Sequence, residues 1–353
     1  GDFLLTEGEK FLRENSHIKG VILSFISNGI LNYLKKRESE ITDLILRQGN
    51  EIKTYPKSGE PEFKINLPLH EEFIKKNYRM PFVRHYPFAT TITNYACPFQ
   101  CSFCVMNTFK YSERNLDNVF YELDYLKKLG TREIFFLDQT IGVNRKKLLE
   151  FLNRMIEKKY GFGWFGFTRV DVVDREVIKL MKEAVCHTLL FGVESANSEI
   201  LEKYRKGYTK EQILRAFQLA KKEGIKTLAT FIVGLPEETR EMIEETIKFS
   251  RELDPDFVSF NFAVPRFGTE LREKALQSNL ISSDVKVMDQ SGTEITMGTA
   301  ALSRQEMQKL KRKAVWGFYL RPKYILRRLL SLTSFTELKL NFKNFLALVK
   351  NEL

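Results

Sequence analysis

The sequence predicts an α/β fold: a partial (β/α)6 barrel of parallel strands, preceded by a small N-terminal piece and followed by a helical C-terminal extension. Two observations support this prediction. From Thr90 onward, short apolar runs alternate with amphipathic segments of helical spacing. Gly130, Gly224 and the Asp254-Pro255 pair stand where helices should end. Repeated strand–helix–strand units with right-handed crossovers curl a parallel sheet into a full or partial barrel.

The expected strands and helices take turns along this part of the chain. The expected strands are Thr90–Ala96, Glu133–Asp138, Phe162–Thr168, Thr188–Val193, Lys226–Val233 and Phe257–Ala263. The expected helices are Leu116–Leu129, Arg145–Lys158, Arg175–Ala184, Lys210–Glu223 and Glu238–Leu253. Such alternation favours a parallel sheet over an antiparallel one.

The two ends of the chain have different patterns. In the first 84 residues, Asp2–Glu9 is expected to form a strand followed by a helix, and Lys53–Leu69 is a linker rich in proline and lysine. Leu271–Leu353 has helical patterns and no strong strand pattern. We therefore expect three domains: residues 1–84, the barrel at 85–275 and a basic, mostly helical extension at 276–353.

Composition limits the class of protein. Of 353 residues, 43% are hydrophobic and 29% are charged, which is typical of a soluble globular protein. No apolar run reaches the roughly 20 residues that a membrane-spanning helix needs, and no secretory leader is visible. Three of the four cysteines fall within eight positions, a pattern that indicates metal binding in a reducing compartment. We expect a cytoplasmic protein.

Most of the net charge of +11 lies at the C-terminus. Residues 301–353 contain twelve Lys or Arg and three Glu, with Trp316, Phe318, Tyr319 and Tyr324 between them. A basic segment with aromatic residues suits an anionic membrane surface, an acidic substrate or a nucleic acid, and of these we expect peripheral membrane contact through residues 301–353. A solvated helical face is the alternative. Nucleic acid is not an expected partner.

The strongest signal is Cys97, Cys101 and Cys104, which have the spacing CxxxCxxC just after the first expected strand. Three thiolates on one short loop can hold three irons of a cubane cluster, which leaves the fourth iron open to a small molecule. A structural zinc site would need a fourth ligand, but His85 lies twelve positions upstream and Cys186 more than eighty downstream. Buried free cysteines are the other alternative.

This loop, including the aromatic Phe103 before the last cysteine, resembles the signature of the radical S-adenosylmethionine (SAM) superfamily. The resemblance extends from about His85 to Ala275. It implies a [4Fe–4S] cluster whose open iron is chelated by SAM, and a one-electron cleavage that releases a 5′-deoxyadenosyl radical. It also implies an electron donor such as flavodoxin or ferredoxin.

The same resemblance assigns roles to polar residues at two strand ends. Asp138 ends the second expected strand, where the family places groups that bind the methionyl amine. The alternative for Asp138 is an N-cap of the next helix. Arg169 follows the third strand and is placed to pair with the methionyl carboxylate, with a surface salt bridge as the alternative.

Two further strand ends are similar to nucleotide-binding elements of the family. Glu194 and Ser195 end the fourth strand in a GxES-like sequence that implies ribose binding. Ile232 and Gly234 lie in a stretch similar to the adenine-contacting GxIxGxxE element, except that Thr230 replaces the first glycine. An ordinary strand-to-helix turn is the alternative for that stretch.

Further segments resemble the cobalamin-associated branch, which includes the anaerobic magnesium-protoporphyrin cyclases and hopanoid-modifying enzymes. Gly268–Leu271 and Phe318–Tyr324 resemble its PGTxL and FYxRPxY segments, and Gly1–Glu9 resembles the last strand of a cobalamin-binding domain. Most of that domain is absent, and no DxHxxG motif is present. We expect cobalamin only if the missing N-terminal domain is present. The four histidines without that context are His17, His70, His85 and His187.

The resulting functional prediction is a radical SAM enzyme that modifies an organic substrate by methyl transfer or C–H functionalisation. A small-molecule or lipid-like substrate is expected. One alternative is a tRNA methylthiotransferase-like enzyme, although that group needs three further cysteines and none precedes Cys97 in this chain. Another alternative is a degenerate barrel that acts as a binding protein.

Overall fold

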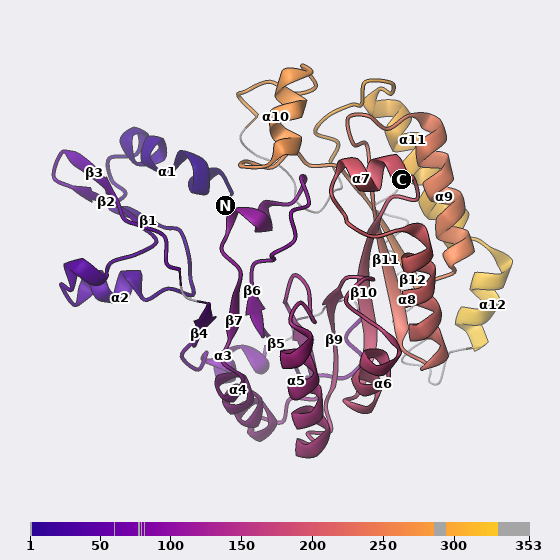
Figure 1. The fold of residues 1–353 in the computed structure, drawn as a ribbon, viewed down its shortest axis with the longest axis horizontal. Helices are drawn as coiled ribbons and strands as arrows, with labels where there is room; N and C mark the ends of the chain where they lie inside the picture. The colour runs from indigo at the N-terminus through magenta and orange to yellow at the C-terminus, as the bar shows by residue number, and fades with distance from the viewer. Residues whose placement is uncertain are drawn as a thin grey trace. The chain divides into compact units, whose positions relative to one another are not determined.

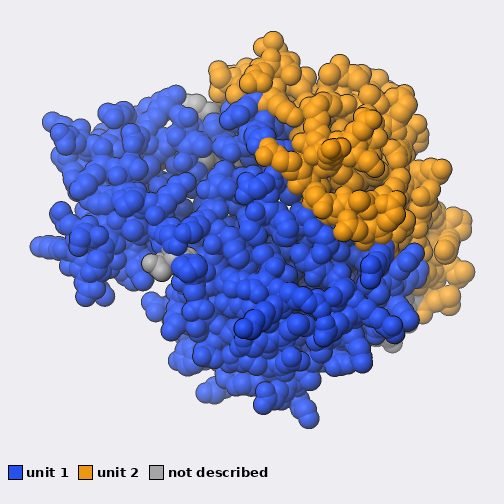
Figure 2. Space-filling view, viewed as in Figure 1, with its two compact units in different colours: residues 1–191, 215–227, 265–273 blue, residues 192–214, 228–264, 274–353 orange. Residues whose placement is uncertain are grey.

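The structure, a computed structural model, describes residues 2–59, 61–76, 78, 80, 82–285 and 294–330. Its chain passes back and forth between two compact units (Figures 1 and 2). Unit 1 comprises residues 1–191, 215–227 and 265–273, and unit 2 comprises residues 192–214, 228–264 and 274–353, each as far as it is described. We describe each unit by itself.

Unit 1 begins with a helix and a small antiparallel sheet. Helix α1 spans Asp2–Glu14, and strands β1 (Gly20–Ile22), β2 (Leu44–Gln48) and β3 (Glu51–Thr54) pair in the order β1-β2-β3. Helix α2 covers Gly29–Leu34, and Figure 1 shows α1 and α2 on opposite sides of the sheet. A short 3-10 turn, η1, lies at Glu38–Glu40.

Strand β2 has two buried faces, because successive side chains of a strand point to opposite sides. Leu44 and Leu46 belong to one buried cluster, against which Ile30 and Tyr33 of the α2 side pack. Ile45, between them, belongs to a second cluster with Leu12 of α1. Each helix therefore covers one face of the same strand.

The expected strand at Asp2–Glu9 is wrong, because these residues belong to helix α1. The helix is kinked at Glu7, where φ is −113°, and Leu4 before the kink and Phe11 and Leu12 after it all pack toward the sheet. The expected linker Lys53–Leu69 contains the end of β3 and the short strand β4 at Glu62–Phe63. Helix α3 follows at His70–Ile74.

The parallel sheet predicted from the alternation is confirmed. In unit 1, β5, β8, β9 and β10 are neighbours in that order, with Ala89 opposite Ile134 and Phe135 opposite Phe165. The strands are β5 (Phe88–Thr91), β8 (Glu133–Phe136), β9 (Gly163–Thr168) and β10 (Cys186–Glu194, which continues into unit 2). The helices between them are α4 (Leu116–Lys128), α5 (Arg145–Lys158) and α6 (Arg175–Glu183).

Aromatic side chains fill the core around these strands. The rings of Phe135 and Phe165 stack with centroids 4.6 Å apart, and Phe136 meets Trp164 edge to face at 5.5 Å. The indole N–H of Trp164 donates to the carbonyl of Ala184 at 2.7 Å, so its one polar group is satisfied. Offset or edge-on aromatic pairs add to the stability that burial provides.

The first expected strand, Thr90–Ala96, is broken in two. Strand β5 ends at Thr91, and the chain resumes as β6 at Asn94–Tyr95 in a different sheet. There β6 pairs antiparallel with β7 (Ser112–Arg114), which also pairs in parallel with β4. The 3-10 turn η2 at Val105–Thr108 lies between β6 and β7.

Unit 2 contains a second piece of parallel sheet. Strand β11 (Lys226–Val233) pairs with β12 (Phe257–Phe262), and Phe231 stacks on Phe260 with centroids 5.0 Å apart. Its helices, two of which extend into unit 1, are α7 (Ser198–Lys203), α8 (Lys210–Lys222), α9 (Arg240–Leu253), α10 (Glu270–Gln277), α11 (Arg304–Tyr319) and α12 (Pro322–Leu330).

The helical C-terminal extension is confirmed as far as it is described, and residues 331–353 lie outside the described part. Helix α11 packs on β12, where the Tyr319 hydroxyl donates to the carbonyl of Val258 at 2.8 Å. Throughout the described ranges, each helix is either too short or too polar to traverse a bilayer.

Candidate functional site

The three cysteines lie on one compact loop of unit 1. The loop leaves β6 through Ala96, whose φ of 63° is in the left-handed region and turns the chain sharply. The Cys104 N–H then donates to the carbonyl of Cys101 at 3.0 Å, and the Asn107 side chain donates to the same carbonyl at 3.1 Å. Cys101 is buried, and Cys97 and Cys104 are half-buried. The loop is therefore held by a backbone hydrogen bond of its own, by the Asn107 side chain and by the Leu271 N–H, which donates to the carbonyl of Ser102 at 3.1 Å.

Two polar side chains reach sulfur atoms of this loop. The Thr140 hydroxyl lies 3.7 Å from Sγ of Cys97, and Nη1 of Arg169 lies 3.7 Å from Sγ of Cys101. Among the described residues, no three His, Cys, Asp or Glu side chains surround a single ion. A cubane cluster makes no such demand, since each thiolate binds its own iron. Hydrogen bonds to the ligand sulfurs are one means by which proteins tune such clusters.

Arg169 is held on several sides. Its Nε and Nη2 donate to the two carboxylate oxygens of Asp171 at 2.9 and 2.8 Å, and its guanidinium lies 3.7 Å from the ring centroid of Phe99. Only 5% of Arg169 is exposed. Arg169 does form a salt bridge, as the alternative expected. The pair lies beside the cysteine loop and is largely buried, so the alternative is wrong in placing it at the surface. Its predicted pairing with a carboxylate ligand stays a prediction.

Asp138 lies just beyond the end of β8 and is fully buried. Its Oδ1 accepts hydrogen bonds from the backbone N–H groups of Thr93 and Asn94 at 2.7 and 2.6 Å, and its Oδ2 accepts from the Thr93 hydroxyl at 3.2 Å. Burial raises the pKa of Asp138 to about 7, although these hydrogen bonds oppose the shift. The N-cap alternative is wrong, because Asn144 caps helix α5.

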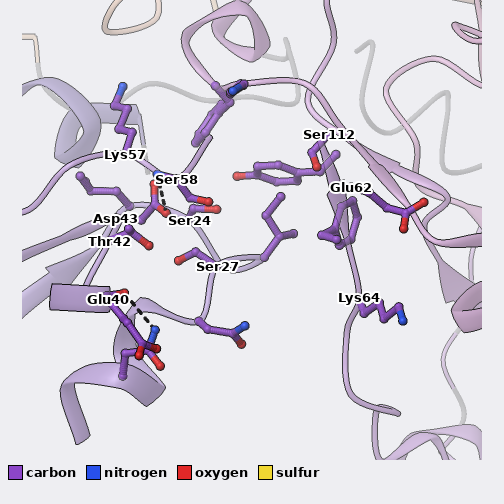
Figure 3. A pocket seen from close by; sticks show the side chains of 18 of the residues that line it. Ser24, Ser27, Glu40, Thr42, Asp43, Lys57, Ser58, Glu62, Lys64 and Ser112 are labelled. Carbon is purple, nitrogen blue, oxygen red and sulfur yellow. Dashed lines mark hydrogen bonds between the residues drawn. The ribbon is translucent and has the colours of Figure 1, made fainter. Parts of the chain in front are cut away.

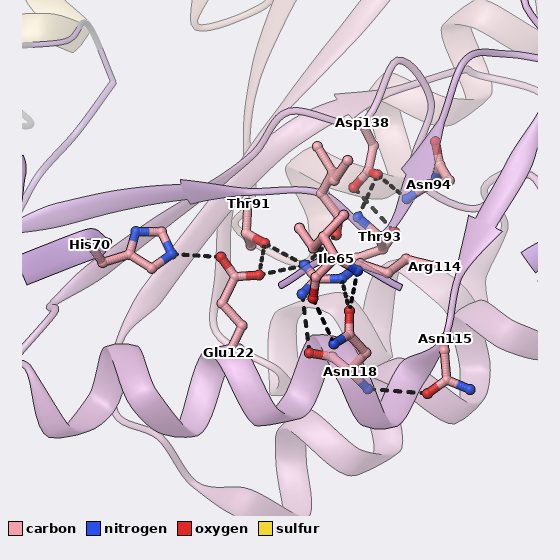
Figure 4. Close-up of polar contacts among 11 residues, drawn as sticks. Ile65, His70, Thr91, Thr93, Asn94, Arg114, Asn115, Asn118, Glu122 and Asp138 are labelled. Atoms are coloured by element: carbon pink, nitrogen blue, oxygen red, sulfur yellow. Dashed lines mark hydrogen bonds and ion pairs between the residues drawn. The ribbon is translucent and has the colours of Figure 1, made fainter. Parts of the chain in front are cut away.

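A second buried charge network contacts the same stretch of chain from β7 (Figure 4). The Arg114 guanidinium donates to the carbonyl of Ile92 at 3.2 Å and to the Thr91 hydroxyl at 3.1 Å. It also pairs with buried Glu122, which in turn contacts Nε2 of His70 at 2.6 Å. Burial tends to raise the pKa of Glu122, but its contacts with His70 and Arg114 leave that pKa below its ordinary value.

The predicted ribose-binding residue, Glu194, lies in unit 2 with a left-handed backbone, at φ 66°. Its Oε1 is 3.1 Å from the ammonium of Lys206, and the two side chains are 13% and 7% exposed. The hydroxyl of Tyr208 donates to the carbonyl of Gly192, and the Lys206 ammonium lies 5.2 Å from the Tyr208 ring centroid. Glu194 is thus an anchored carboxylate.

Ser195, predicted beside Glu194, is fully buried. Its hydroxyl lies 3.3 Å from the Thr246 hydroxyl and accepts from the Asn197 N–H at 3.2 Å. These contacts connect the end of β10 to helix α9. Ser195 therefore has a packing role, and its predicted cofactor contact remains untested.

The turn after β11 is held from within unit 2. Gly234 has φ 90°, and a Cβ built on it would lie 2.6 Å from Sδ of Met307 on α11. Oε2 of buried Glu238 accepts from the N–H groups of Gly234 and Leu235 at 2.7 and 3.0 Å. Burial raises the pKa of Glu238 to about 7. Ile232, on β11, is half-buried.

Unit 1 also contains a cavity of about 480 Å³ that the sequence did not predict (Figure 3). Its lining is mixed, with Lys57 and Glu62 among the charged residues and Tyr95 and Phe109 among the aromatic ones. Buried Asp43 lines it and accepts from the Ser58 N–H at 3.0 Å. None of the predicted site residues lines this cavity. Phe103, the last of the residues predicted to contact the cofactor, is half-buried on the cysteine loop.

Sequence reasoning missed the partners of the predicted residues: Thr140, Lys206 and Glu238. Lys206 follows Arg205, whose positive φ of 54° turns the chain back toward Glu194. Nothing in the local sequence marks that turn. Thr140 and Glu238 do have a signal, since each stands within five residues after an expected strand, where polar groups collect at the carboxyl edge of a parallel sheet.

Comparisons with known proteins indicate the family of the chain. Residues 91–250 match the family model described as the Radical SAM superfamily. An uncharacterized methyltransferase of Pyrococcus horikoshii is 36% identical over 269 residues, which cover 75% of this chain and 58% of that protein. The anaerobic magnesium-protoporphyrin IX monomethyl ester cyclase of Rubrivivax gelatinosus is 38% identical over 181 residues, covering 49% of this chain and 33% of the cyclase.

Among solved structures, the cobalamin-dependent SAM radical enzyme OxsB, with aqua-cobalamin and SAM bound, has a TM-score of 0.67 at 12% identity. The match covers 100% of this chain and 58% of OxsB. At that identity the likeness concerns the fold. The chain thus spans about half the length, or less, of the proteins it matches.

Proposed function

Because this chain belongs to the radical SAM superfamily, we propose that it cleaves SAM reductively at a [4Fe–4S] cluster and modifies an organic substrate. Methyl transfer or C–H functionalisation is the proposed outcome, in line with the methyltransferase and cyclase among its relatives. The observation that carries the proposal is the set of three thiols, Cys97, Cys101 and Cys104, on one self-bonded loop.

The residues present fit a cluster by their chemistry. Three sulfur ligands stand on a loop of eight residues, and Thr140 and Arg169 lie within reach of two of the sulfurs. When bound, the cluster and SAM supply a one-electron cleavage of a sulfonium, which yields an organic radical. The protein's part is to hold the sulfurs, orient the nucleotide and exclude water.

We propose three contacts with SAM. Arg169, already oriented by Asp171, would donate to the methionyl carboxylate. Glu194 would accept from ribose hydroxyls through Oε2, which has no hydrogen bond among the described residues. Ile232 and Gly234 would contact the adenine at the end of β11, on the side of Gly234 that Met307 does not cover.

Anaerobic reconstitution tests the proposal. We expect about four irons and four sulfides per chain and absorbance near 400 nm, as is usual for thiolate-ligated iron. Cys101→Ala should lose both, while Cys186→Ala, which removes the buried cysteine outside the loop, should retain them. A colourless wild-type protein, or equal iron content in the two variants, would contradict the proposal and favour the alternative of a degenerate barrel that acts as a binding protein.

The product assay separates methyl transfer from other radical chemistry. Incubation with SAM, a reductant and a candidate substrate should yield 5′-deoxyadenosine; S-adenosylhomocysteine in addition would indicate methyl transfer. The substrate is proposed as a small or lipid-like organic molecule. The electron donor is proposed as a flavodoxin or ferredoxin, and chemical reduction by dithionite can replace it in the assay.

Cobalamin enters the proposal only together with an N-terminal cobalamin-binding domain. The residues that line the 480 Å³ cavity of unit 1 include no histidine, so they offer cobalt no imidazole ligand. Titration of this chain with hydroxocobalamin should leave the absorption spectrum of the cobalamin unchanged. A shift in that spectrum at equimolar protein would contradict this.

Peripheral membrane contact through residues 301–353 is also proposed, although 331–353 lie outside the described part. On α12, Leu326, Leu329 and Leu330 are more than half exposed, which favours contact with lipid. Much of the nearby positive charge is engaged, because Arg321 and Arg327 both pair with Asp254. Co-sedimentation with anionic vesicles should fall in a Leu326→Ser/Leu329→Ser variant; equal binding to neutral vesicles would oppose the proposal.

A further inference from the structure

The stretch Thr91–Asn94 connects the parallel sheet to the cysteine loop, and it is where the predicted first strand breaks. The break has a visible cause. The N–H groups of Thr93 and Asn94 both point to Oδ1 of Asp138 instead of continuing a ladder. The next cysteine, Cys97, is only three residues beyond Asn94. Whatever fixes this stretch therefore also fixes the start of the loop.

The turn after β8 contacts the loop at further points. The Asn94 side chain donates to the carbonyl of Thr140 at 3.1 Å, and the Thr140 hydroxyl lies 3.7 Å from Sγ of Cys97. Asp138 and Thr140 are both buried, so water does not compete for these contacts. Residues 138–140 thus meet the stem of the loop and its first sulfur.

Arg114 holds the opposite side of the same stem. Its backbone N–H donates to the carbonyl of Thr93 at 2.9 Å, and its guanidinium donates to the carbonyl of Ile92. The stem is therefore bonded through the N–H groups of Thr93 and Asn94 to a buried carboxylate, and through two carbonyls to the backbone N–H and the guanidinium of Arg114. Figure 4 shows both side chains converging on it.

We propose that Asp138, together with Thr140, is a positioning residue that clamps the stem of the cysteine loop and sets the geometry in which the loop binds metal. Both of its carboxyl oxygens already accept hydrogen bonds from Thr93 and Asn94, which supports this role, and the variants below separate it from the expected contact with the methionyl ammonium. The inference rests on the proposed function for the identity of the metal group, but the hydrogen bonds of the clamp are made between groups of the chain alone.

Asparagine separates the two roles. In Asp138→Asn, the amide oxygen can still accept from both backbone N–H groups, and the amide nitrogen can donate to the Thr93 hydroxyl. The clamp survives, but the negative charge that an ammonium ligand would need is gone. Asp138→Ala removes the clamp, and Asp138→Ser, with a side chain too short to span both amides, removes it with a smaller cavity.

The first measurement is amide hydrogen exchange of residues 92–97 in the metal-free protein. We expect exchange to quicken about tenfold or more in Asp138→Ala and Asp138→Ser and to stay near wild type in Asp138→Asn. Asp174→Ala, which removes an exposed N-cap of α6, is the matched control and should leave these amides unchanged. Unchanged exchange in both the Ala and Ser variants would overturn the proposal.

The second measurement is iron bound per chain, with SAM affinity measured on the loaded protein. Asp138→Ser should lose at least half of its iron, and Asp138→Asn should bind iron and SAM as the wild type does. If Asp138→Asn keeps its iron but loses SAM, Asp138 is a ligand of the ammonium and the clamp is not its main role. If the wild type binds no iron, the proposed function fails while the exchange result still decides the clamp.

Discussion

The ammonium of Lys206 lies 3.1 Å from Oε1 of Glu194, and both side chains are largely shielded from solvent. Removing one member of a buried ion pair destabilises a protein, because the other charge stays buried without its partner. Glu194 also has a left-handed backbone, which costs energy in a residue with a Cβ. The ion pair with Lys206 therefore holds the Glu194 carboxylate in place although the backbone conformation at Glu194 is unfavourable.

Lys206→Met should lower the free energy of unfolding by about 2 kcal/mol, because it leaves the Glu194 carboxylate without its counterion. Urea unfolding of the metal-free protein measures this. Lys248→Met is the control: the Lys248 side chain is 80% exposed and, within the described residues, its ion pair is with Glu252 one turn away, so its loss should cost about 0.5 kcal/mol or less. Equal effects of the two variants would show that the pair with Glu194 contributes nothing.

Gly234→Ala should destabilise the protein by about 2 kcal/mol or more, since the new Cβ meets Sδ of Met307 and the φ of 90° disfavours alanine. Gly130→Ala is the control for backbone strain alone. Its φ is 77°, but a Cβ there meets nothing within 4 Å, so it should cost about 1 kcal/mol. Thermal unfolding measures the stability of both variants. Equal destabilisation by Gly130→Ala and Gly234→Ala would show that the contact with Met307 adds nothing to the backbone strain.

Glu238 should make the protein less stable as pH rises from about 4.5 to 7. Its pKa is about 7 in the folded state against an ordinary value of 4.5, so the folded protein binds more protons across that window and loses stability as they leave. The shift corresponds to about 3 kcal/mol. Glu238→Gln should remove this part of the dependence in urea unfolding at pH 5 and pH 8. Glu252→Gln, on the exposed face of α9, should not alter it.

Arg169→Met should lower the reduction potential of the reconstituted cluster, because it removes a positive charge 3.7 Å from Sγ of Cys101 and so disfavours the added electron. Lys179→Met, which removes an exposed charge on α6, should leave the potential unchanged. A redox titration followed by electron paramagnetic resonance reads both. A potential that rises in Arg169→Met would contradict the assignment.

Much of the fold followed from sequence patterns. The bounds expected for α5 and β11 match the structure, because their apolar periodicity is regular and turn residues end them. The α/β class and the parallel sheet were confirmed for the same reason. The strand expected at Asp2–Glu9 was wrong because a short apolar run fits either periodicity, and tertiary packing on Val21 and Ile45 decided for the helix.

In the candidate site, too, features that are local in sequence could be predicted, and contacts between distant positions could not. That Cys97, Cys101 and Cys104 share one loop could be predicted from spacing alone, since their positions are local in sequence, and their role as cluster ligands stays a prediction. The partners of Asp138 and Glu194 could not, because they depend on contacts across 44 and 12 positions that only the folded chain brings together. The break in the first strand has the same origin, since Asp138 takes the N–H groups that a ladder would have used.

The C-terminal helices matter for anyone who wishes to express a shorter piece of this chain. Met307 of α11 fills the space beside Gly234, and Tyr319 bonds to the edge strand at Val258. A fragment that stops at the end of β12 would bare the apolar side of that strand and the turn before α9, and we expect it to precipitate. The cut should be placed no earlier than Leu330.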